Sequence, residues 1–285
     1  MSTVDQFESV FRAAAKTTYV HHDLPIDKIL LVTDMDEAQS KLYLNLVDKF
    51  LEKNFSADKD CSVLSANDFA SVKELLGKIE EFRPDLLITY RNLRSPSWRW
   101  PFSLGEYLDV LTQVTTTPVL VLPHPDRDDT TDFLSEPLVN VMAVSGHMCG
   151  EGSLIRYASA FTPKGGKLML SHVEDQSTLD RYLDAIEKIP DIDSDVARET
   201  ILDRLLNDAK DFSESASKGL REAGIEITVE CMAQLGSRLD DYRKLIEDGE
   251  VDLLVMHAKE DDQLAMHGMA YPLAVELRSV PLLLL

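Results

Sequence analysis

The segment SGHMCGEG, residues 145–152, places chemically active side chains close together in the sequence. It holds His147 and Cys149 between a predicted strand and a predicted helix. The positive end of a helix favours a thiolate, so Cys149 is a candidate reactive thiol; the alternative is a small residue in a tight glycine-rich turn. The H-x-C pair has no further ligands at zinc spacing, and the sequence therefore predicts no metal site.

A second group of such side chains lies in YRNLRSPSWRW, residues 90–100. Its cationic and aromatic residues are Arg91, Arg94, Trp98, Arg99 and Trp100. The segment follows a predicted strand, and open α/β sheets bind ligands at the carboxyl ends of their strands. Arginine and tryptophan are also enriched in interface hot spots. The segment is therefore either a recognition surface for an anion or a partner, or a structural cover in which the arginine heads stay in solvent.

No catalytic motif accompanies these groups. The sequence contains no G-x-S-x-G, H-E-x-x-H or P-loop signature, and these are the arrangements that position a nucleophile, a metal ion or a polyphosphate. We therefore expect a protein that is not an enzyme and that has no cofactor.

The charge of the chain excludes further classes of function. Its 285 residues include 29 Lys and Arg against 50 Asp and Glu, a formal net charge of −21. A field of this sign repels phosphate backbones and anionic lipids, so we expect no nucleic-acid or membrane partner. Three scattered cysteines fit a reducing compartment, and no uncharged apolar run approaches the ~20 residues of a membrane span. The composition predicts a cytoplasmic globular protein.

Short apolar runs alternate with segments of helical spacing along the chain. Strands are predicted at 29–32, 63–64, 85–88, 119–122, 139–144, 167–173, 225–232, 252–256 and 280–285. Helices are predicted at 4–14, 42–51, 67–82, 104–114, 153–161, 195–223, 239–247 and 269–277. We expect Asn67 or Asp68 to cap one helix and Gly224 to end the longest one. This order predicts an α/β fold with parallel, doubly wound sheets.

The order of elements occurs twice, which indicates an internal repeat. Gly105 precedes Pro118 by 13 positions, and Gly268 precedes Pro281 by the same 13. The middle of the first half is shorter, which indicates the loss of about one strand and one long helix. The sequence therefore predicts two tandem α/β domains: a shortened one over 1–125, an acidic exposed linker over 126–137, and a full-length one over 138–285.

The repeated unit resembles a universal stress protein domain. In the second half the resemblance rests on NVMAVSG, KLMLSHVED, GIEITVECMAQLGS, DLLVMH and GMAYPLAVELRSVPLLLL, in the family's order. In the first half it rests on DKILLVTDMDEAQSKLYLNLV, DLLITY and GEYLDVLTQVTTTPVLVLP. Family members pair their final strands between subunits. The resemblance therefore implies an intrachain pseudo-dimer, in which strands 119–122 and 282–285 pair around a pseudo-twofold axis.

The nucleotide-binding members of this family carry G-x2-G-x9-G-[ST] after the fourth strand, and both halves depart from it. After Met256, the early glycine places hold His257 and Glu260, and Met269 follows Gly268 at a shortened spacing. After Thr89, the same places hold Tyr90 and Leu93, and Glu106 follows Gly105. The base-facing aspartate is matched by Asp34 in the first half and replaced by Ser145 or Gly146 in the second.

The candidate ligand-binding residues are those that remain at the family's positions, together with the nearby arginines. They are Asp34, Arg91, Arg94, Gly105, Met256 and Gly268. We expect a non-catalytic stress-response or regulatory protein that binds an unidentified protein partner or small ligand, and not ATP. The alternatives are an ATP- or AMP-binding universal stress protein with weak or no hydrolysis, and a redox sensor acting through Cys149. A homodimer is a further alternative for assembly.

Overall fold

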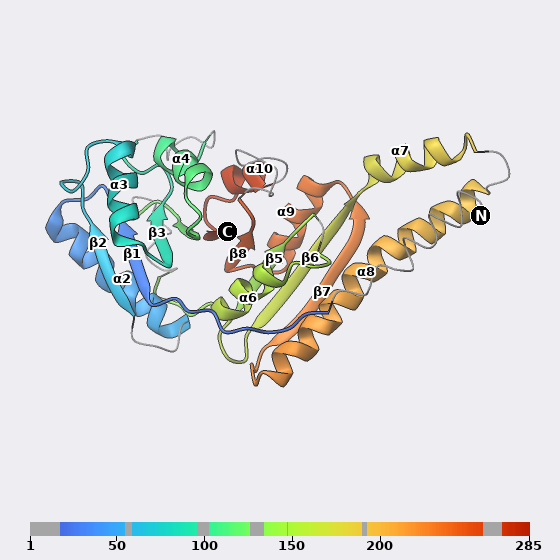
Figure 1. Ribbon diagram of the computed structural model, residues 1–285, viewed down its shortest axis with the longest axis horizontal. Helices are drawn as coiled ribbons and strands as arrows, with labels where there is room; N and C mark the ends of the chain where they lie inside the picture. The colour runs from blue at the N-terminus through green and yellow to red at the C-terminus, as the bar shows by residue number, and fades with distance from the viewer. Residues whose placement is uncertain are drawn as a thin grey trace.

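The structure is a computed structural model that describes residues 18–54, 59–95, 103–125, 134–146, 148–189, 193–258 and 270–285. These residues form a nine-stranded sheet in the order β2-β1-β3-β4-β9-β8-β5-β6-β7 (Figure 1). The predicted fold class, an α/β chain with mostly parallel strands, is confirmed. The predicted helix over 4–14 lies outside the described residues.

The elements of the first half match the predicted order. They are β1 (Lys28–Val32), α2 (Glu37–Asn54), β2 (Asp60–Leu64), α3 (Val72–Phe82), β3 (Leu86–Tyr90), α4 (Glu106–Val114) and β4 (Val119–Leu122). Strands β3 and β4 are buried along their whole length, which is why they appear in the sequence as unbroken apolar runs.

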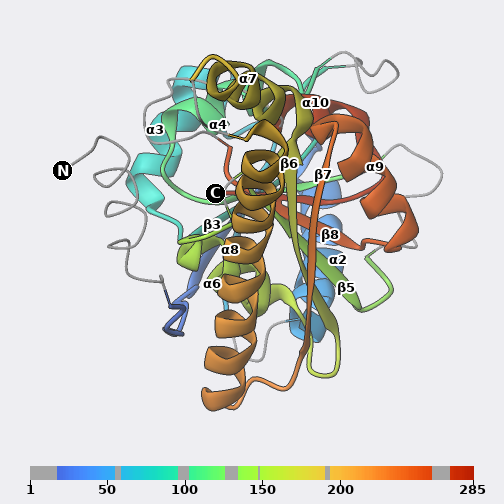
Figure 2. The ribbon, with the colours of Figure 1, turned by 90° about the vertical axis from the view of Figure 1, so that its right-hand side faces the viewer.

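The second half is longer. Its elements are β5 (Asn140–Val144), α6 (Gly152–Phe161), β6 (Lys167–Asp175), α7 (Gln176–Ile186), α8 (Ser194–Glu222), β7 (Thr228–Gly236), α9 (Arg238–Asp248), β8 (Leu253–Met256), α10 (Ala270–Glu276) and β9 (Leu282–Leu284). Within the described ranges, β7 and the helices before it have no counterpart in the first half. Helices α8 and α9 flank β6 and β7 on opposite sides (Figure 2).

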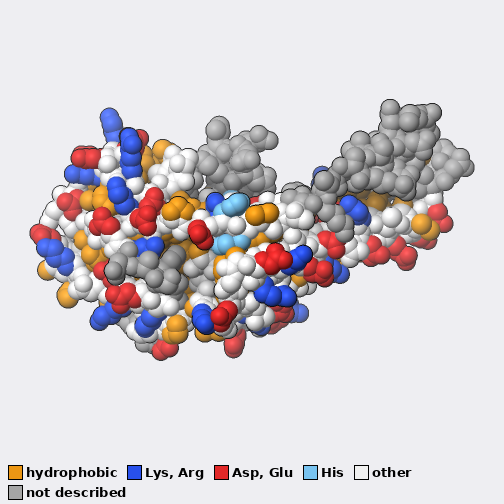
Figure 3. All heavy atoms as spheres, turned by 60° about the horizontal axis from the view of Figure 1, so that its bottom comes forward, with side chains coloured by type: hydrophobic (Ala, Val, Ile, Leu, Met, Phe, Trp, Pro, Cys, Tyr) orange, Lys and Arg blue, Asp and Glu red, His pale blue; other side chains and the backbone are white. Residues whose placement is uncertain are grey.

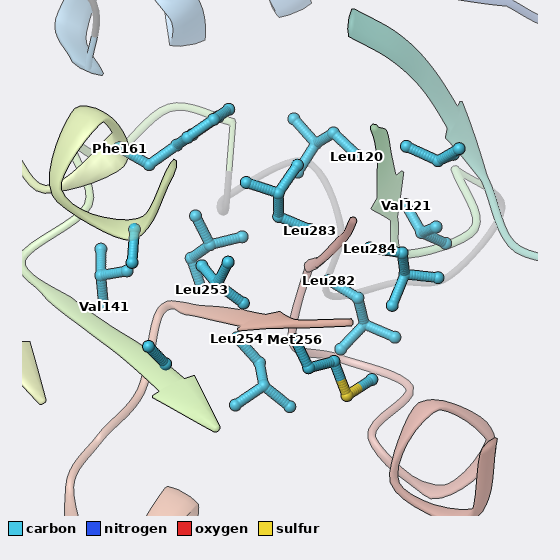
Figure 4. Packing of buried hydrophobic residues seen from close by; sticks show 14 of the residues in the cluster. Leu120, Val121, Val141, Phe161, Leu253, Leu254, Met256, Leu282, Leu283 and Leu284 are labelled. Carbon is cyan, nitrogen blue, oxygen red and sulfur yellow. The ribbon is translucent and has the colours of Figure 1, made fainter. Parts of the chain in front are cut away.

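The two halves join through their final strands. Strand β4 pairs with β9 in antiparallel register, with Leu120 opposite Leu283, whereas the other strand pairs of the sheet are parallel. Figure 4 shows leucine and valine side chains of β4, β8 and β9 packed together at this junction. The predicted pairing of these strands is confirmed, and it covers two apolar strands that would otherwise be exposed edges.

Two aspartates make the same hydrogen bonds in the two halves. Asp85 Oδ2 accepts the backbone N–H groups of Asp27 and Lys28. Asp252 Oδ2 accepts those of Val139 and Asn140. In each half, the aspartate lies just before the strand that pairs with the first strand, β3 or β8, and it ties down the start of that first strand.

Several predicted boundaries are wrong. Ser71 caps α3, and its hydroxyl accepts the Glu74 N–H at 3.2 Å. Asp68 instead accepts the Ser65 N–H and hydroxyl in the preceding turn. Leu134, in the segment predicted as an exposed linker, is buried. Gly224 does adopt a positive φ of 78° at the end of α8, as predicted.

Strand β7 starts later and ends later than predicted, because it pairs with β6 along all nine residues of each strand. Helix α7 has no predicted counterpart. Its described buried side chains are Leu179 and Leu183. With Tyr182 and Ile186 they follow the i, i+3, i+4, i+7 spacing of an amphipathic helix, a signal that the prediction missed.

The segment before β1 crosses the second half. Figure 1 shows it running past α6 towards α8. The Tyr19 backbone N–H donates to Ser215 Oγ at 2.9 Å. A Cβ on Gly219 would lie 3.0 Å from the Tyr19 ring, so the glycine permits this close approach. This segment therefore ties the start of the first half to a helix of the second.

Candidate ligand-binding crevices

The loops at the carboxyl ends of the strands in each half are the places where an open α/β sheet would hold a ligand. In the first half these loops follow β1, β2 and β3, and they contain Asp34, Arg91 and Arg94. In the second half they follow β5, β6 and β8, and they contain Ser145, Glu151 and His257, while His172 lies within β6.

Tyr90, the last residue of β3, fills the ligand position of the first half, which we call its crevice. Its hydroxyl donates to Asp34 Oδ1 and accepts the Asp34 backbone N–H at 3.0 Å. The tyrosine is fully buried and packs edge-on against Tyr43 and His124. Burial, reinforced by the Asp34 carboxylate, raises the pKa of Tyr90 well above its usual range. The carboxylate that the resemblance assigns to a base is therefore bound by the chain's own phenol.

Arg94 makes hydrogen bonds that hold the same loop in place. Its backbone N–H donates to Asp34 Oδ2 at 2.6 Å. Its guanidinium donates to the carbonyl oxygens of Ala66 and Phe69 and lies 4.4 Å from the centre of the Phe69 ring. The backbone of Arg94 therefore holds the loop after β3 against the loop after β1, and its guanidinium holds it against the loop after β2.

Arg91 is buried, with 4% of its surface exposed. Its guanidinium donates to the carbonyl oxygens of Ala274 and Leu277, at the carboxyl end of α10 in the other half. The last carbonyls of a helix lack partners within the helix and carry its negative end, which explains why a buried cation is stable here. Both guanidinium groups donate to backbone carbonyls, so binding of an anion by Arg91 or Arg94 would have to compete with these hydrogen bonds, and their anion-binding role stays a prediction.

Gly105 is a glycine because of packing within the chain. It has a φ of 99°, and a Cβ would lie 2.7 Å from the Asn92 Cα. Asn92 N–H in turn donates to the Leu104 carbonyl at 2.7 Å. The loop after β3 thus lies directly against the start of α4, where a phosphate cradle would need open space. Trp98, Arg99 and Trp100 lie outside the described residues.

In the second half, His257 takes the position that Tyr90 takes in the first. Its Nε2 lies 2.9 Å from Glu151 Oε2, and both side chains are half-buried. Ser145 Oγ donates to the other carboxylate oxygen, Glu151 Oε1, at 3.1 Å. The first glycine place of each half therefore holds a side chain that contacts a carboxylate from the loop after that half's first strand.

Tyr242, on α9, closes the remaining part of this crevice. It is fully buried, and its hydroxyl accepts the Val173 N–H at 2.8 Å and donates to the Ser145 carbonyl at 3.1 Å. Beside it, His172 Nε2 lies 3.3 Å from Glu174 Oε2 in a buried pair. Tyr242 and Glu151 were not among the predicted site residues; the position of Glu151 in the 145–152 segment was the only local signal.

The two remaining candidates are Met256 and Gly268. Met256 is buried in β8 and packs at the junction of the halves (Figure 4). Gly268, His147, Glu260 and Met269 lie outside the described residues.

The cysteines differ in their surroundings. Cys149 is exposed in the turn before α6, whereas Cys61 and Cys231 are partly buried. Burial, together with the neighbouring Asp48, raises the pKa of Cys61 to about 12. No three His, Cys, Asp or Glu side chains in the described ranges are arranged to hold a metal ion. None of the described helices has both the length and the apolarity needed to cross a membrane.

Comparison with known proteins identifies the fold. No protein-family model and no curated protein matches the chain. A universal stress protein from Archaeoglobus fulgidus DSM 4304 matches with a TM-score of 0.50 at 13% identity, covering 90% of this chain and 95% of that one. A functionally unknown protein from Pseudomonas aeruginosa PAO1 matches with a TM-score of 0.47 at 12% identity, covering 92% and 93%. Together with the strand order, the first match shows that this chain has the fold of the universal stress proteins.

Proposed function

We propose that this protein is a non-catalytic regulatory or stress-response protein that binds a partner or a small ligand and does not bind ATP. The observation that supports this most strongly is the matching position of Tyr90 and His257. Each residue takes the first glycine place of its half, and each contacts a carboxylate across the crevice. A polyphosphate needs backbone N–H groups at close range, and a side chain paired with a carboxylate blocks that approach and adds like charge.

The two crevices differ in what they offer a ligand. In the first half, Tyr90 is fully buried and Asp34 already accepts two hydrogen bonds. In the second half, His257 and Glu151 are each about a quarter to a third exposed, at 32% and 26%. A small ligand of the second half would therefore meet one carboxylate and one imidazole, a pair suited to a polar neutral or cationic group.

Isothermal titration with Mg-ATP tests the proposal. Losing two charge-assisted hydrogen bonds, at ~1.5–3 kcal/mol each, weakens binding by roughly two to four orders of magnitude. We expect no measurable heat at concentrations that saturate a nucleotide-binding member of the fold. A micromolar dissociation constant would establish the alternative, nucleotide binding, for which the retained Asp34 is the supporting residue. Native mass spectrometry of the purified chain then reveals any small molecule that travels with it.

We also propose that the two halves arose by duplication and form an intrachain pseudo-dimer. The equivalent bonds of Asp85 and Asp252 and the antiparallel β4–β9 pair support this. Because the strand that would pair two subunits is already paired within the chain, we expect the protein not to dimerise through this strand. Sedimentation equilibrium measures the oligomeric state directly.

A further inference from the structure

The helices α7 and α8 form an arm that projects from the end of the sheet. In Figure 1 the carboxyl end of α7 and the amino end of α8 lie beyond the strands. With 29 residues, α8 is about 43 Å long at 1.5 Å per residue. We define the arm as residues 176–189, which contain α7, and residues 194–208, the first part of α8.

The arm has its own small hydrophobic contact. Leu179 and Leu183 of α7 are buried but do not belong to the main core cluster, whereas α8 joins that cluster only from Ala209 onward. The two helices contact each other, and the described residues of the arm lie outside the main core cluster. A small satellite contact of this kind leaves apolar surface uncovered.

Large apolar side chains remain exposed near the tip of the arm. Tyr182 is 56% exposed, Ile189 is 49% exposed and Val196 is 60% exposed. Ile201, Leu202 and Leu205 behind them are only partly buried. Single exposed apolar residues are ordinary, but a group of them on one projecting element is typical of a docking surface.

The charge around these side chains is acidic. The residues of the arm, 176–189 and 194–208, contain seven Asp and Glu against four Lys and Arg, which gives 4 − 7 = −3. Two of the four cations already pair with acidic side chains of the arm: Arg198 with Asp180 at 3.5 Å and Arg204 with Asp208 at 3.0 Å. Figure 3 shows acidic and hydrophobic side chains together on the described part of the arm.

We propose that the arm docks a basic amphipathic helix of a partner protein, with the partner's apolar face on Tyr182, Ile189 and Val196. Complementary charge selects this occupant, since a second copy would bring another arm of charge −3 and another chain of charge −21. This inference rests on the proposed function, of which it names the partner-binding surface. Docking of an apolar helix face with basic flanks is a recurrent mode of peptide recognition.

The experiment measures fluorescence anisotropy of a labelled helical peptide of about 18 Leu and Lys residues, with Leu on one face. The full-length chain is titrated at ~50 mM and ~300 mM salt. A peptide with Glu in place of Lys is the charge control. The arm variant is Tyr182→Ser, Ile189→Ser, Val196→Ser. The matched control variant is Leu42→Ser, Leu46→Ser, Val114→Ser, whose apolar side chains are comparably exposed outside the arm.

We expect the Leu/Lys peptide to bind the wild type and the control variant with equal affinity. We expect its affinity for the arm variant to be about tenfold lower, and its affinity for the wild type to fall at high salt. Equal affinities for the two variants, or no binding of the peptide, would overturn the proposal. So would a wild-type dimer that the arm variant abolishes, or binding that requires deletion of residues 1–17, because either result assigns the arm to another occupant. Mg-ATP binding, by contrast, would contradict the proposed function and leave this anisotropy assay unaffected.

Discussion

His257 Nε2 lies 2.9 Å from Glu151 Oε2, at the position where Tyr90 of the first half contacts Asp34. The two halves therefore reach the same result with different chemistry, an imidazole–carboxylate pair in one and a phenol–carboxylate pair in the other. In both, the contact joins the loop after the first strand to the carboxyl end of the strand beside it in the sheet. This contact narrows the space in which the fold would hold a ligand.

A double-mutant cycle on His257→Ala and Glu151→Ala tests whether this pair is coupled. We expect a coupling free energy of about 0.5–1.5 kcal/mol in denaturant unfolding, because the pair is partly exposed and partly screened by solvent. Ser145 also donates to Glu151, so Glu151→Ala alone is expected to cost more than His257→Ala alone. A coupling of zero would mean that the two side chains do not hold the loops together.

Arg91→Ala tests the link between the halves. The change removes two charge-assisted hydrogen bonds to Ala274 and Leu277 and leaves both carbonyls without this donor. We expect a loss of about 2–4 kcal/mol in the free energy of unfolding. Arg91→Lys is expected to restore little of it, because an ammonium cannot reach two carbonyls with the planar geometry of a guanidinium.

Lys73→Ala, at an exposed position of α3, is the matched control and is expected to change stability by less than about 0.5 kcal/mol. If Arg91→Ala were equally mild, the guanidinium would not stabilise the junction, and the recognition surface expected from the sequence would regain support.

Thiol labelling tests the surroundings of the cysteines. The thiolate is the reactive form, and the pKa of Cys61 is raised from 9.0 to about 12. Folding therefore holds Cys61 protonated, and this contribution to stability is present below pH 9 and is lost as the pH rises from 9 towards 12. At pH 8 we expect Cys149, which is exposed, to react with a disulfide reagent first, before Cys231 and Cys61.

The Cys149→Ser variant provides the control for that order, since it should remove the fast phase and leave the slow ones. Equal rates for the three thiols in the folded chain would exclude the redox-sensor alternative and show that Cys61 is accessible.

The β4–β9 junction could be predicted because the resemblance implies it and because two short apolar runs, each last in its half, lie at edges that must be covered. The contents of the crevices could not. Arg91 lies 183 residues from Ala274, and its sequence neighbours suggested a surface loop. Tyr242 closes the second crevice only because α9 crosses back over β6. Such a role depends on the packing of distant elements, and a single tyrosine in an amphipathic helix carries no local sign of it.

Two glycine-to-alanine substitutions test how closely the loop after β3 packs against α4 in the first crevice. Gly105 has a φ of 99°, and a Cβ there would lie 2.7 Å from the Asn92 Cα, whereas Gly77, in α3, has nothing within 4 Å of its Cβ position. A positive φ costs a side chain about 1–3 kcal/mol, and the clash is with backbone that cannot rotate away. We therefore expect Gly105→Ala to destabilise the chain by at least about 2 kcal/mol in thermal or denaturant unfolding.

Gly77→Ala is the matched control, because the same substitution in an open helix interior stabilises by up to about 1 kcal/mol. Opposite signs for the two variants would establish that the loop after β3 fills the space beside α4 and leaves no cradle there for a phosphate. If Gly105→Ala were as stable as the wild type, the loop could move away from α4 at no cost. The crevice of the first half would then be open to a ligand, with Asp34 and the amino end of α4 at its border.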